Sequence, residues 1–254
     1  MKVTFLGTGT SQGVPLIACK CKVCQSQNHK DKRLRTSILV EVNGKNLVVD
    51  SGPDFRQQML RAGVERLDAL LLTHAHKDHI AGMDDIRAFN FRQKEAIDVF
   101  CTEKVEQQIR QEFAYIFAEF KYPGIPEINL YNINADASFE AAGFVVEPVE
   151  VMHYKLPVLG FKFDDFVYIT DANFISGKEL QKIKGCKVLV LNALRKEPHI
   201  SHFTLQEALE LIQEIKPEQA YLTHISHQLG MHDEVSAELP EGVYLAYDGL
   251  TLTI

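Results

Sequence analysis

One stretch of the chain decides the fold, Leu70-Leu71-Leu72-Thr73-His74-Ala75-His76-Lys77-Asp78-His79, in which an apolar strand runs directly into three histidines and an aspartate. Crowded titratable groups of this kind are poorly satisfied unless they bind something, because a buried polar group without a partner is costly. Neutral imidazole nitrogens and carboxylate oxygens suit zinc, manganese, iron or nickel. The spacing H-x-H-x-D-H therefore predicts a metal-binding segment at a strand end, and the plainer alternative is a solvated polar loop.

The bulk composition is that of an ordinary globular protein. The 254 residues are 46% hydrophobic and 24% charged, with a formal net charge of -7. No apolar run approaches the roughly 20 residues that span a bilayer, and the N-terminus lacks the features of a signal peptide. We therefore expect a cytoplasmic protein without membrane contact. The acidic balance does not favour nucleic-acid binding, although a local basic patch could still provide it.

Strand and helix patterns interleave along the whole chain. Apolar or alternating runs predict strands over residues 2–8, 37–42, 45–50, 69–74, 98–102, 144–153, 160–163, 166–170, 187–192, 220–224 and 243–254. Helical spacing predicts helices over 54–62, 85–91, 104–120 and 204–215. Asn43-Gly44 is a strong hairpin-turn signal, and Asp164-Asp165 and Asp248-Gly249 are weaker ones. With no linker or repeat, this order predicts one α/β domain over residues 1–254.

Three of the five cysteines, Cys19, Cys21 and Cys24, crowd into one short segment. Without an export signal, such a cluster indicates metal binding rather than disulfides. Three thiolates are one ligand short of a closed tetrahedral zinc site, and His227 is a candidate for the fourth. A structural zinc would then fasten the N-terminal loop beside the strand of His224, whereas three reduced loop cysteines are the alternative. Cys101 and Cys186 are predicted to be buried, inert thiols.

The histidine segment resembles the signature of the metallo-β-lactamase superfamily, whose fold is a four-layer αββα sandwich. Asp50-Ser51-Gly52 is similar to the D-x-G turn of that superfamily. Three further positions also match, each at the end of a predicted strand: His153, Asp171 and His224. Taken singly, each of the three could be a structural histidine or a turn former.

The resemblance implies a site for two divalent metal ions, zinc or manganese. One metal would be held by His74, His76 and His153. The other would be held by Asp78, His79 and His224, with Asp171 bridging the two metals. A metal-bridging hydroxide would attack a phosphate ester or an acyl bond, and Asp78 would belong to the catalytic residues as well as to the ligands.

Within the superfamily, the chain resembles the PhnP-type phosphodiesterases and, more distantly, tRNase Z. The pairing of C-x-C-x-x-C with H-x-x-H, which ends at His227, is the most discriminating feature. In that group the histidine of an H-x-T element protonates the leaving alkoxide, and His202 matches it. A surface histidine near a helix start is the alternative. Glu207 either orients His202 or only caps the helix.

Other residues near these motifs carry weaker signals. The glycine-rich loop from Gly7 to Gly13 either lines the substrate pocket or is a flexible turn. Arg33 and Arg35 could contact phosphate, but a solvated basic stretch over residues 30–35 is the better interpretation. The remaining histidines fit no motif position, namely His29, His199 and His232.

The leading hypothesis is a metal-dependent phosphodiesterase for small cyclic or diester phosphates, with phosphoribosyl 1,2-cyclic phosphate as the PhnP-type substrate. A tRNase Z-like endonuclease is disfavoured, because only Pro123-Gly124-Ile125-Pro126 after Lys121 hints at an inserted loop where that family has an arm. A thioester or lactone hydrolase is disfavoured, because the residues after His224 indicate strands. A PqqB-like binding protein is disfavoured by the complete ligand set. The resemblance also implies a homodimer.

Overall fold

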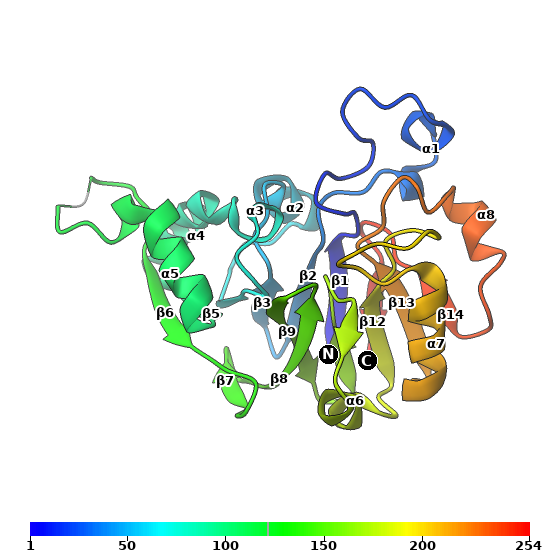
Figure 1. Ribbon diagram of the computed structural model, residues 1–254. Coiled ribbons are helices and arrows are strands. Elements are labelled where there is room, and N and C mark those ends of the chain that lie inside the picture. Colours follow the sequence, from blue (N-terminus) through cyan, green and yellow to red (C-terminus); the bar gives the residue numbers. More distant parts are fainter. Residues whose placement is uncertain (121) are drawn as a thin grey trace.

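The computed structural model describes residues 1–120 and 122–254 and contains two β-sheets stacked between helices. Figure 1 shows α4 and α5 at one side of the molecule, α7 at the other side and α6 at the lower end of the strands. Both sheets are mixed, with parallel and antiparallel neighbours. The predicted four-layer αββα sandwich is confirmed.

The first sheet has seven strands in the order β15-β1-β2-β3-β4-β5-β6. Its members are β1 (Lys2–Gly7), β2 (Ser37–Val42), β3 (Lys45–Val49), β4 (Ala69–Leu71), β5 (Ile97–Cys101), β6 (Ile128–Asn132) and β15 (Thr251–Thr253). β2 and β3 form the hairpin predicted at Asn43-Gly44, where both residues have positive φ, as a type I′ turn requires.

The second sheet has eight strands, with β11-β8-β9-β10-β12-β13-β14 in order and β7 paired to β8. Its members are β7 (Phe139–Ala141), β8 (Phe144–His153), β9 (Leu156–Phe163), β10 (Phe166–Tyr168), β11 (Phe174–Ile175), β12 (Val188–Asn192), β13 (Gln219–Thr223) and β14 (Val243–Leu245). The Asp164-Asp165 turn joins β9 to β10 as a hairpin, as predicted.

The helices lie between the strands in the chain and on the outer sides of the sheets. The α-helices are α1 (Lys22–Gln25), α2 (Phe55–Ala62), α3 (Lys77–Ile80), α4 (Arg87–Gln93), α5 (Glu103–Glu112), α6 (Gly177–Ile183), α7 (Leu205–Ile215) and α8 (His232–Ser236). The 3-10 helices are η1 (His29–Asp31), η2 (Met83–Ile86) and η3 (Ala114–Ile116). None of these described helices is both long and apolar enough to cross a membrane.

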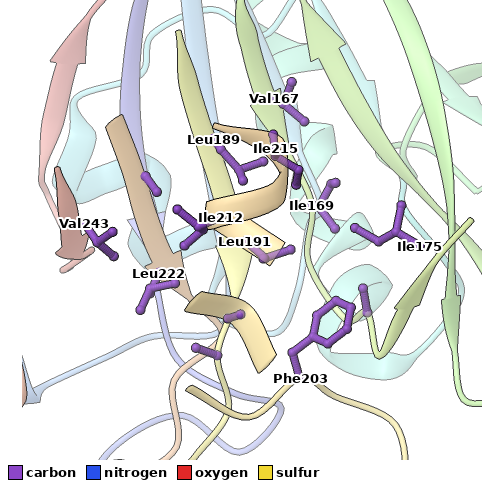
Figure 2. Packing of buried hydrophobic residues seen from close by; sticks show 14 of the residues in the cluster. Val167, Ile169, Ile175, Leu189, Leu191, Phe203, Ile212, Ile215, Leu222 and Val243 are labelled. Atoms are coloured by element: carbon purple, nitrogen blue, oxygen red, sulfur yellow. The ribbon is translucent and has the colours of Figure 1, made fainter. Parts of the chain in front are cut away.

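Three apolar clusters fill the three spaces between the four layers. Because side chains alternate along a strand, Leu70 packs toward α2 and its neighbours, whereas Leu71 faces the second sheet. The second sheet divides its side chains in the same way. Figure 2 shows Ile212 and Ile215 of α7 packed against Leu189, Leu191 and Leu222 of that sheet. Strands buried on both faces are consequently apolar at nearly every position.

Several predicted elements differ from those observed. The predicted helix over 85–91 is the end of η2 followed by α4, and Asp248-Gly249 forms no hairpin because β14 and β15 lie in different sheets. The expected strand over 243–254 is two strands in different sheets, because the chain turns at Gly249 (φ +92°) and crosses from β14 to β15. The expected helix over 104–120 ends at Glu112, since Phe113 leaves helical geometry with φ -113° and ψ 41°.

Candidate metal centre and its surroundings

The proposed metal ligands lie at the carboxyl ends of strands from both sheets. His74, His76 and His79 follow β4, and His153 is the last residue of β8. Asp171 follows β10 and His224 follows β13. The structure brings all seven predicted positions into two adjoining groups.

The first group consists of His74, His76 and His153, whose ligand atoms lie within 4.8 Å of one another. His74 Nε2 is 3.0 Å from His76 Nδ1. His153 Nδ1 donates to the carbonyl oxygen of Ser201 at 2.9 Å, which leaves its Nε2 free to face the group. An outer hydrogen bond of this kind fixes the tautomer and the ring orientation that a metal ligand needs.

The second group consists of Asp78, His79, Asp171 and His224, again with ligand atoms within 4.8 Å. His79 Nε2 is 3.1 Å from Asp171 Oδ2 and 3.2 Å from Asp78 Oδ2. His224 Nε2 is 3.0 Å from Asp171 Oδ1. Asp171 therefore presents its two oxygens to two different histidines.

The atoms of the second group fit a bound cation better than they fit one another. His79 Nε2 and both ring nitrogens of His224 are buried and have no hydrogen-bond partner with acceptable geometry, although carboxylate oxygens lie close by. Buried polar atoms without partners cost free energy. A divalent cation bound by His79 Nε2 and one nitrogen of His224 would remove part of that cost, and the donor set is one that zinc and manganese accept.

Asp50 and Thr73 contact the sides of His79 and His74 that face away from the other ligands. His79 Nδ1 donates to Asp50 Oδ2 at 2.6 Å, and the Thr73 hydroxyl donates to the same oxygen at 2.9 Å. The Thr73 hydroxyl also contacts His74 Nδ1 at 3.0 Å. Asp50 belongs to the D-x-G turn seen in the sequence, but no sequence signal pointed to Thr73.

The D-x-G glycine permits a close approach of two backbone segments. A Cβ atom on Gly52 would lie only 2.0 Å from the carbonyl oxygen of Asp78. Three residues of the site also have left-handed backbone, with φ of +65° at Asp50, +55° at Asp171 and +54° at His224. Such conformations are unfavourable for residues other than glycine and cluster at functional sites.

Charge coupling in the buried centre shifts several pKa values. Burial alone would raise the pKa of Asp171, but His224 and His79 beside it lower the pKa well below its usual range. Burial would lower the pKa of His79, whereas Asp50 and the other carboxylates raise it well above its usual range. Burial lowers the pKa of His74 and of His153. These two imidazoles are therefore neutral at pH 7, as metal ligands must be.

His202 lies in contact with both groups. Its Nε2 donates to Asp171 Oδ1 at 2.8 Å, and its Nδ1 lies 3.1 Å from Ser201 Oγ. His202 also forms a third possible ligand group with His153 and Asp171, and burial lowers its pKa to about 4.

The surroundings of His202 include one contact that the sequence did not indicate, and they decide between the two alternatives for Glu207 in favour of the helix cap. His199, which fitted no motif, has its Nδ1 3.2 Å from that of His202. Glu207 forms the capping box with Thr204, whose backbone N–H and hydroxyl both donate to Glu207 Oε2. Glu207 is therefore engaged with the start of α7 and has no hydrogen bond to His202 in the described part of the chain.

The cysteine cluster forms a separate group outside the sheets. The Cys19, Cys21, Cys24 and His227 ligand atoms lie within 4.8 Å of one another. His227 Nδ1 is 3.5 Å from Cys19 Sγ and 3.3 Å from Cys21 Sγ. The hydrogen bond from His227 lowers the pKa of the Cys21 thiol to about 6, whereas burial raises that of Cys24 to about 11. Cys101 and Cys186 are buried in apolar clusters, as predicted.

The glycine-rich loop connects the cysteine segment to the metal centre. Ile225 N–H donates to the carbonyl oxygen of Thr8 at 2.9 Å, and Thr10 N–H donates back to that of Ile225 at 3.1 Å. Gly9 N–H donates to Leu34 on the other side at 2.7 Å. The loop thus lies directly beside the segment that carries His224.

The expected solvated basic stretch over 30–35 is wrong for Arg33. Its side chain is 4% exposed and donates to Thr8 Oγ1 at 2.8 Å and to the Ala246 carbonyl at 2.6 Å. It also lies 3.1 Å from His232 Nδ1. Arg35 pairs with Asp54 at 3.1 Å. Arg33 is buried because the loop folds back over residues near the C-terminus, a contact that no local pattern indicates.

A cavity of about 450 Å³ opens beside the first ligand group. His76 and His153 form its inner wall, and Lys104, Lys155 and Ser201 lie around it. A volume of this size is typical of small-molecule sites. A compact molecule in this cavity would therefore contact the first ligand group.

Comparison with known proteins agrees with the metallo-β-lactamase resemblance of the sequence. The model of the beta-lactamase superfamily domain matches residues 45–225. The crystal structure of a new diphosphatase from the PhnP family has 37% sequence identity and a TM-score of 0.93, and the alignment covers 100% of this chain and 97% of that chain.

Curated relatives are longer. An octanoyltransferase of Porphyromonas gingivalis is 40% identical over 256 residues, which is 100% of this chain and 52% of that protein. A ribonuclease Z of Bradyrhizobium diazoefficiens is 29% identical over 165 residues, which is 63% of this chain and 49% of that protein. The chain thus spans about half the length of these relatives. Since the family model covers most of the chain, including the proposed ligands from His74 to His224, the chain belongs to the beta-lactamase superfamily.

Proposed function

We propose that the chain is a metal-dependent phosphodiesterase that hydrolyses small cyclic or diester phosphates. One observation carries the proposal: His202, a proton donor, contacts Asp171 between two adjoining groups of possible metal ligands. Ligands for two cations with a proton donor beside them suit the cleavage of a phosphoester bond.

The two groups of possible ligands suggest which residues would hold each metal. His74, His76 and His153 would hold one cation, and Asp78, His79 and His224 the other, with an oxygen of Asp171 toward each. Bound metals would lower the pKa of a water molecule and neutralise the charge that develops on phosphoryl oxygens. Cys19, Cys21, Cys24 and His227 would hold a structural zinc.

The chain's own residues handle the leaving group. His202 Nε2 would carry the proton that the departing alkoxide takes up. Burial lowers the pKa of His202 to about 4, and the negative charge of a phosphate beside the ring would favour its protonated form. Asp171 orients the ring through the 2.8 Å hydrogen bond, and Ser201 and His199 contact the opposite nitrogen.

Three observations favour a small substrate over a precursor tRNA. The cavity beside the centre measures about 450 Å³. The described residues between Glu112 and Ile128 hold only the short helix η3 and loop. The PhnP-family diphosphatase resembles the chain over its full length.

A second candidate is hydrolysis of an acyl ester or thioester. The observation that favours it is the 40% identity to a protein named octanoyltransferase, which extends over the whole of this chain. The same centre could activate water for an acyl carbon, but two lysines at the cavity suit a more highly charged substrate.

The test measures product release by zinc- or manganese-loaded protein on four substrates: bis(4-nitrophenyl) phosphate, phosphoribosyl 1,2-cyclic phosphate, a precursor tRNA and an octanoyl thioester. We expect hydrolysis of the first two and neither of the others. Cleavage of the tRNA alone, or of the thioester alone, would overturn the proposed substrate class. A metal-free sample is the control.

A further inference from the structure

The cavity beside the first ligand group is lined by two lysines in addition to the proposed metal ligands. Lys104 and Lys155 both line it, together with His76 and His153. No aspartate or glutamate is among the residues that line it. In a chain of net charge -7, an acid-free cavity with two ammonium groups indicates an anionic ligand.

Neither lysine is neutralised by the protein. Both side chains are exposed, and neither forms an ion pair with any residue over 1–120 or 122–254. Other surface lysines do find acidic partners: Lys178 lies 3.2 Å from Asp136, and Lys77 pairs with Glu112 on α5 itself. The two ammonium groups at the cavity are thus available to a ligand.

The two lysines reach the cavity from rigid but separate elements. Lys104 lies in the first turn of α5, whose start is capped by the Thr102 side chain. Lys155 lies in the two-residue turn between β8 and β9, where His153 pairs with Leu156. The turn is therefore tied directly to a proposed metal ligand.

Tyr154 and Lys155 both line the cavity and contact each other. The Lys155 ammonium lies 5.2 Å from the centroid of the Tyr154 ring, a cation–π contact. Tyr154 itself has a left-handed backbone (φ +58°), and its N–H donates to Asn173 Oδ1 at 2.6 Å. The turn is thus fixed in a conformation that a flexible loop would not keep.

From this arrangement we infer that Lys104 and Lys155 form a subsite for a second phosphate group of the substrate, next to the scissile phosphate. The inference rests on the proposed function and narrows its substrate class. The substrates are diesters or cyclic esters that carry another phosphate, either in a diphosphate linkage or across a sugar. Tyr154 is a positioning residue for Lys155.

Lysine ammonium groups recognise phosphate as point charges, and each charge-assisted contact is worth roughly tenfold in affinity. A substrate with a single phosphate satisfies the metals but leaves the subsite without an anion. Discrimination between one-phosphate and two-phosphate substrates should therefore depend on these two residues.

The kinetic test compares a pair of substrates that differ only in a second phosphate, and adds one diphosphate compound. The metal-loaded protein is assayed on thymidine 5′-(4-nitrophenyl phosphate) with and without a 3′-phosphate, and on ADP-ribose as the diphosphate. Preference for the 3′-phosphorylated compound would indicate a phosphate across a sugar, and preference for ADP-ribose would indicate a diphosphate.

For the 3′-phosphorylated compound, or for ADP-ribose, we expect a lower KM than for the one-phosphate compound. In the double variant Lys104→Ala/Lys155→Ala, this preference should fall by about a hundredfold, on the scale of tenfold per contact. Lys184→Ala, an exposed lysine at the end of α6, is the matched control and should keep the preference. A preference that persists in the double variant overturns the subsite.

A binding measurement keeps this test independent of turnover. By calorimetry on the metal-loaded protein, ADP should bind more tightly than AMP, and the double variant should lose the difference. Equal binding of ADP and AMP by the wild-type protein overturns the subsite. Absence of hydrolysis of all substrates, with the ADP preference retained, overturns the proposed function but not the subsite.

The positioning role of Tyr154 has its own readout. Tyr154→Ala should raise KM for the two-phosphate substrate about tenfold without lowering kcat, and Tyr154→Phe, which keeps the ring, should restore KM. An equal fall of kcat in both variants would assign Tyr154 a general structural role.

Discussion

The buried histidine–aspartate centre and the cysteine cluster differ in what holds their ligands in place. In the buried centre, the ligands follow the ends of sheet strands. Asp50 and the Ser201 carbonyl hold the rings of His79 and His153 by hydrogen bonds, and Thr73 donates to Asp50. His79 and His224 are at most 1% exposed. The centre is therefore preformed by the core of the protein.

The cysteine cluster is supported mainly by hydrogen bonds of its own loop, such as those of the Leu16 and Cys24 N–H groups to cysteine sulfur atoms. Its three thiols lie on a loop with the four-residue helix α1, beside a small apolar cluster of Val14, Val23 and Cys24. Little apolar burial is available there to order the loop. A metal would therefore contribute mainly to catalysis at the buried centre and mainly to folding stability at the cysteine cluster.

The largest effect is expected for Asp171→Asn in the buried centre. Asp171 faces His79, His202 and His224, so its charge serves both proposed metals and the proton donor. We expect kcat to fall by more than the ~100-fold typical of removing an outer partner of a metal ligand. The thermal midpoint should fall little, because the core is unchanged. Asp165→Asn, in the exposed β9–β10 turn, is the control. Full metal content and full activity in Asp171→Asn would remove the bridging role.

The next effect is expected for His202→Ala. Loss of a general acid lowers kcat by roughly 10²–10⁴-fold. The loss should be small for a 4-nitrophenolate leaving group, which departs without a proton, and large for a sugar alkoxide. Metal content, measured by mass spectrometry, should stay as in the wild type. Equal losses on both leaving groups, accompanied by loss of metal, would make His202 a ligand instead. His199→Ala should have a smaller effect.

For the cysteine cluster we expect a change in stability rather than in chemistry. Cys21→Ser should remove about one zinc per chain and lower the thermal midpoint, because binding free energy at a structural site is folding free energy. The metals of the buried centre should remain. Cys186→Ala, which alters a buried thiol outside the cluster, should keep all zinc. Unchanged stability after zinc loss would show that the loop is ordered without the metal.

The smallest effect is expected for the contact between Arg33 and His232, which joins the N-terminal loop to α8. Burial, followed by the neighbouring Arg33, lowers the pKa of His232 to about 4 from 6.5. The unfolded chain therefore binds more protons between these values, so the stability contributed by neutral His232 is lost as pH falls from 6.5 through 4. His232→Asn keeps an acceptor for Arg33 and should flatten this part of the pH dependence of the unfolding free energy. An identical pH dependence in both proteins would contradict the assignment.

The sequence predicted the buried centre better than its surroundings for a physical reason. The ligands from His74 to His79 are set by local spacing, and the later ones lie at strand ends whose hydrophobic patterns are clear. Their side chains do meet, but whether they bind metals stays a prediction. The chain's single-domain organisation and its dimeric state also stay predictions.

What the sequence could not give are contacts between distant segments. Arg33 and His232 are 199 positions apart, and nothing local shows that a lysine-rich stretch folds inward. Lys104 and Lys155 carry no motif, and only the fold places both at one cavity. His199 gains its contact with His202 from the loop that precedes α7. Tertiary structure decides each of these.

The pairing of β1 with β15 has a consequence for how the protein can be joined to others. The amino group of Met1 donates to the Ile254 carbonyl at 2.9 Å, and Ile254 N–H donates back to Met1 at 2.9 Å. The far end of β1 leads to the loop beside Ile225, so both termini leave the fold away from the proposed ligands. A short peptide could close the backbone into a ring, or a neighbouring polypeptide could be spliced onto either end, without disturbing the chemistry.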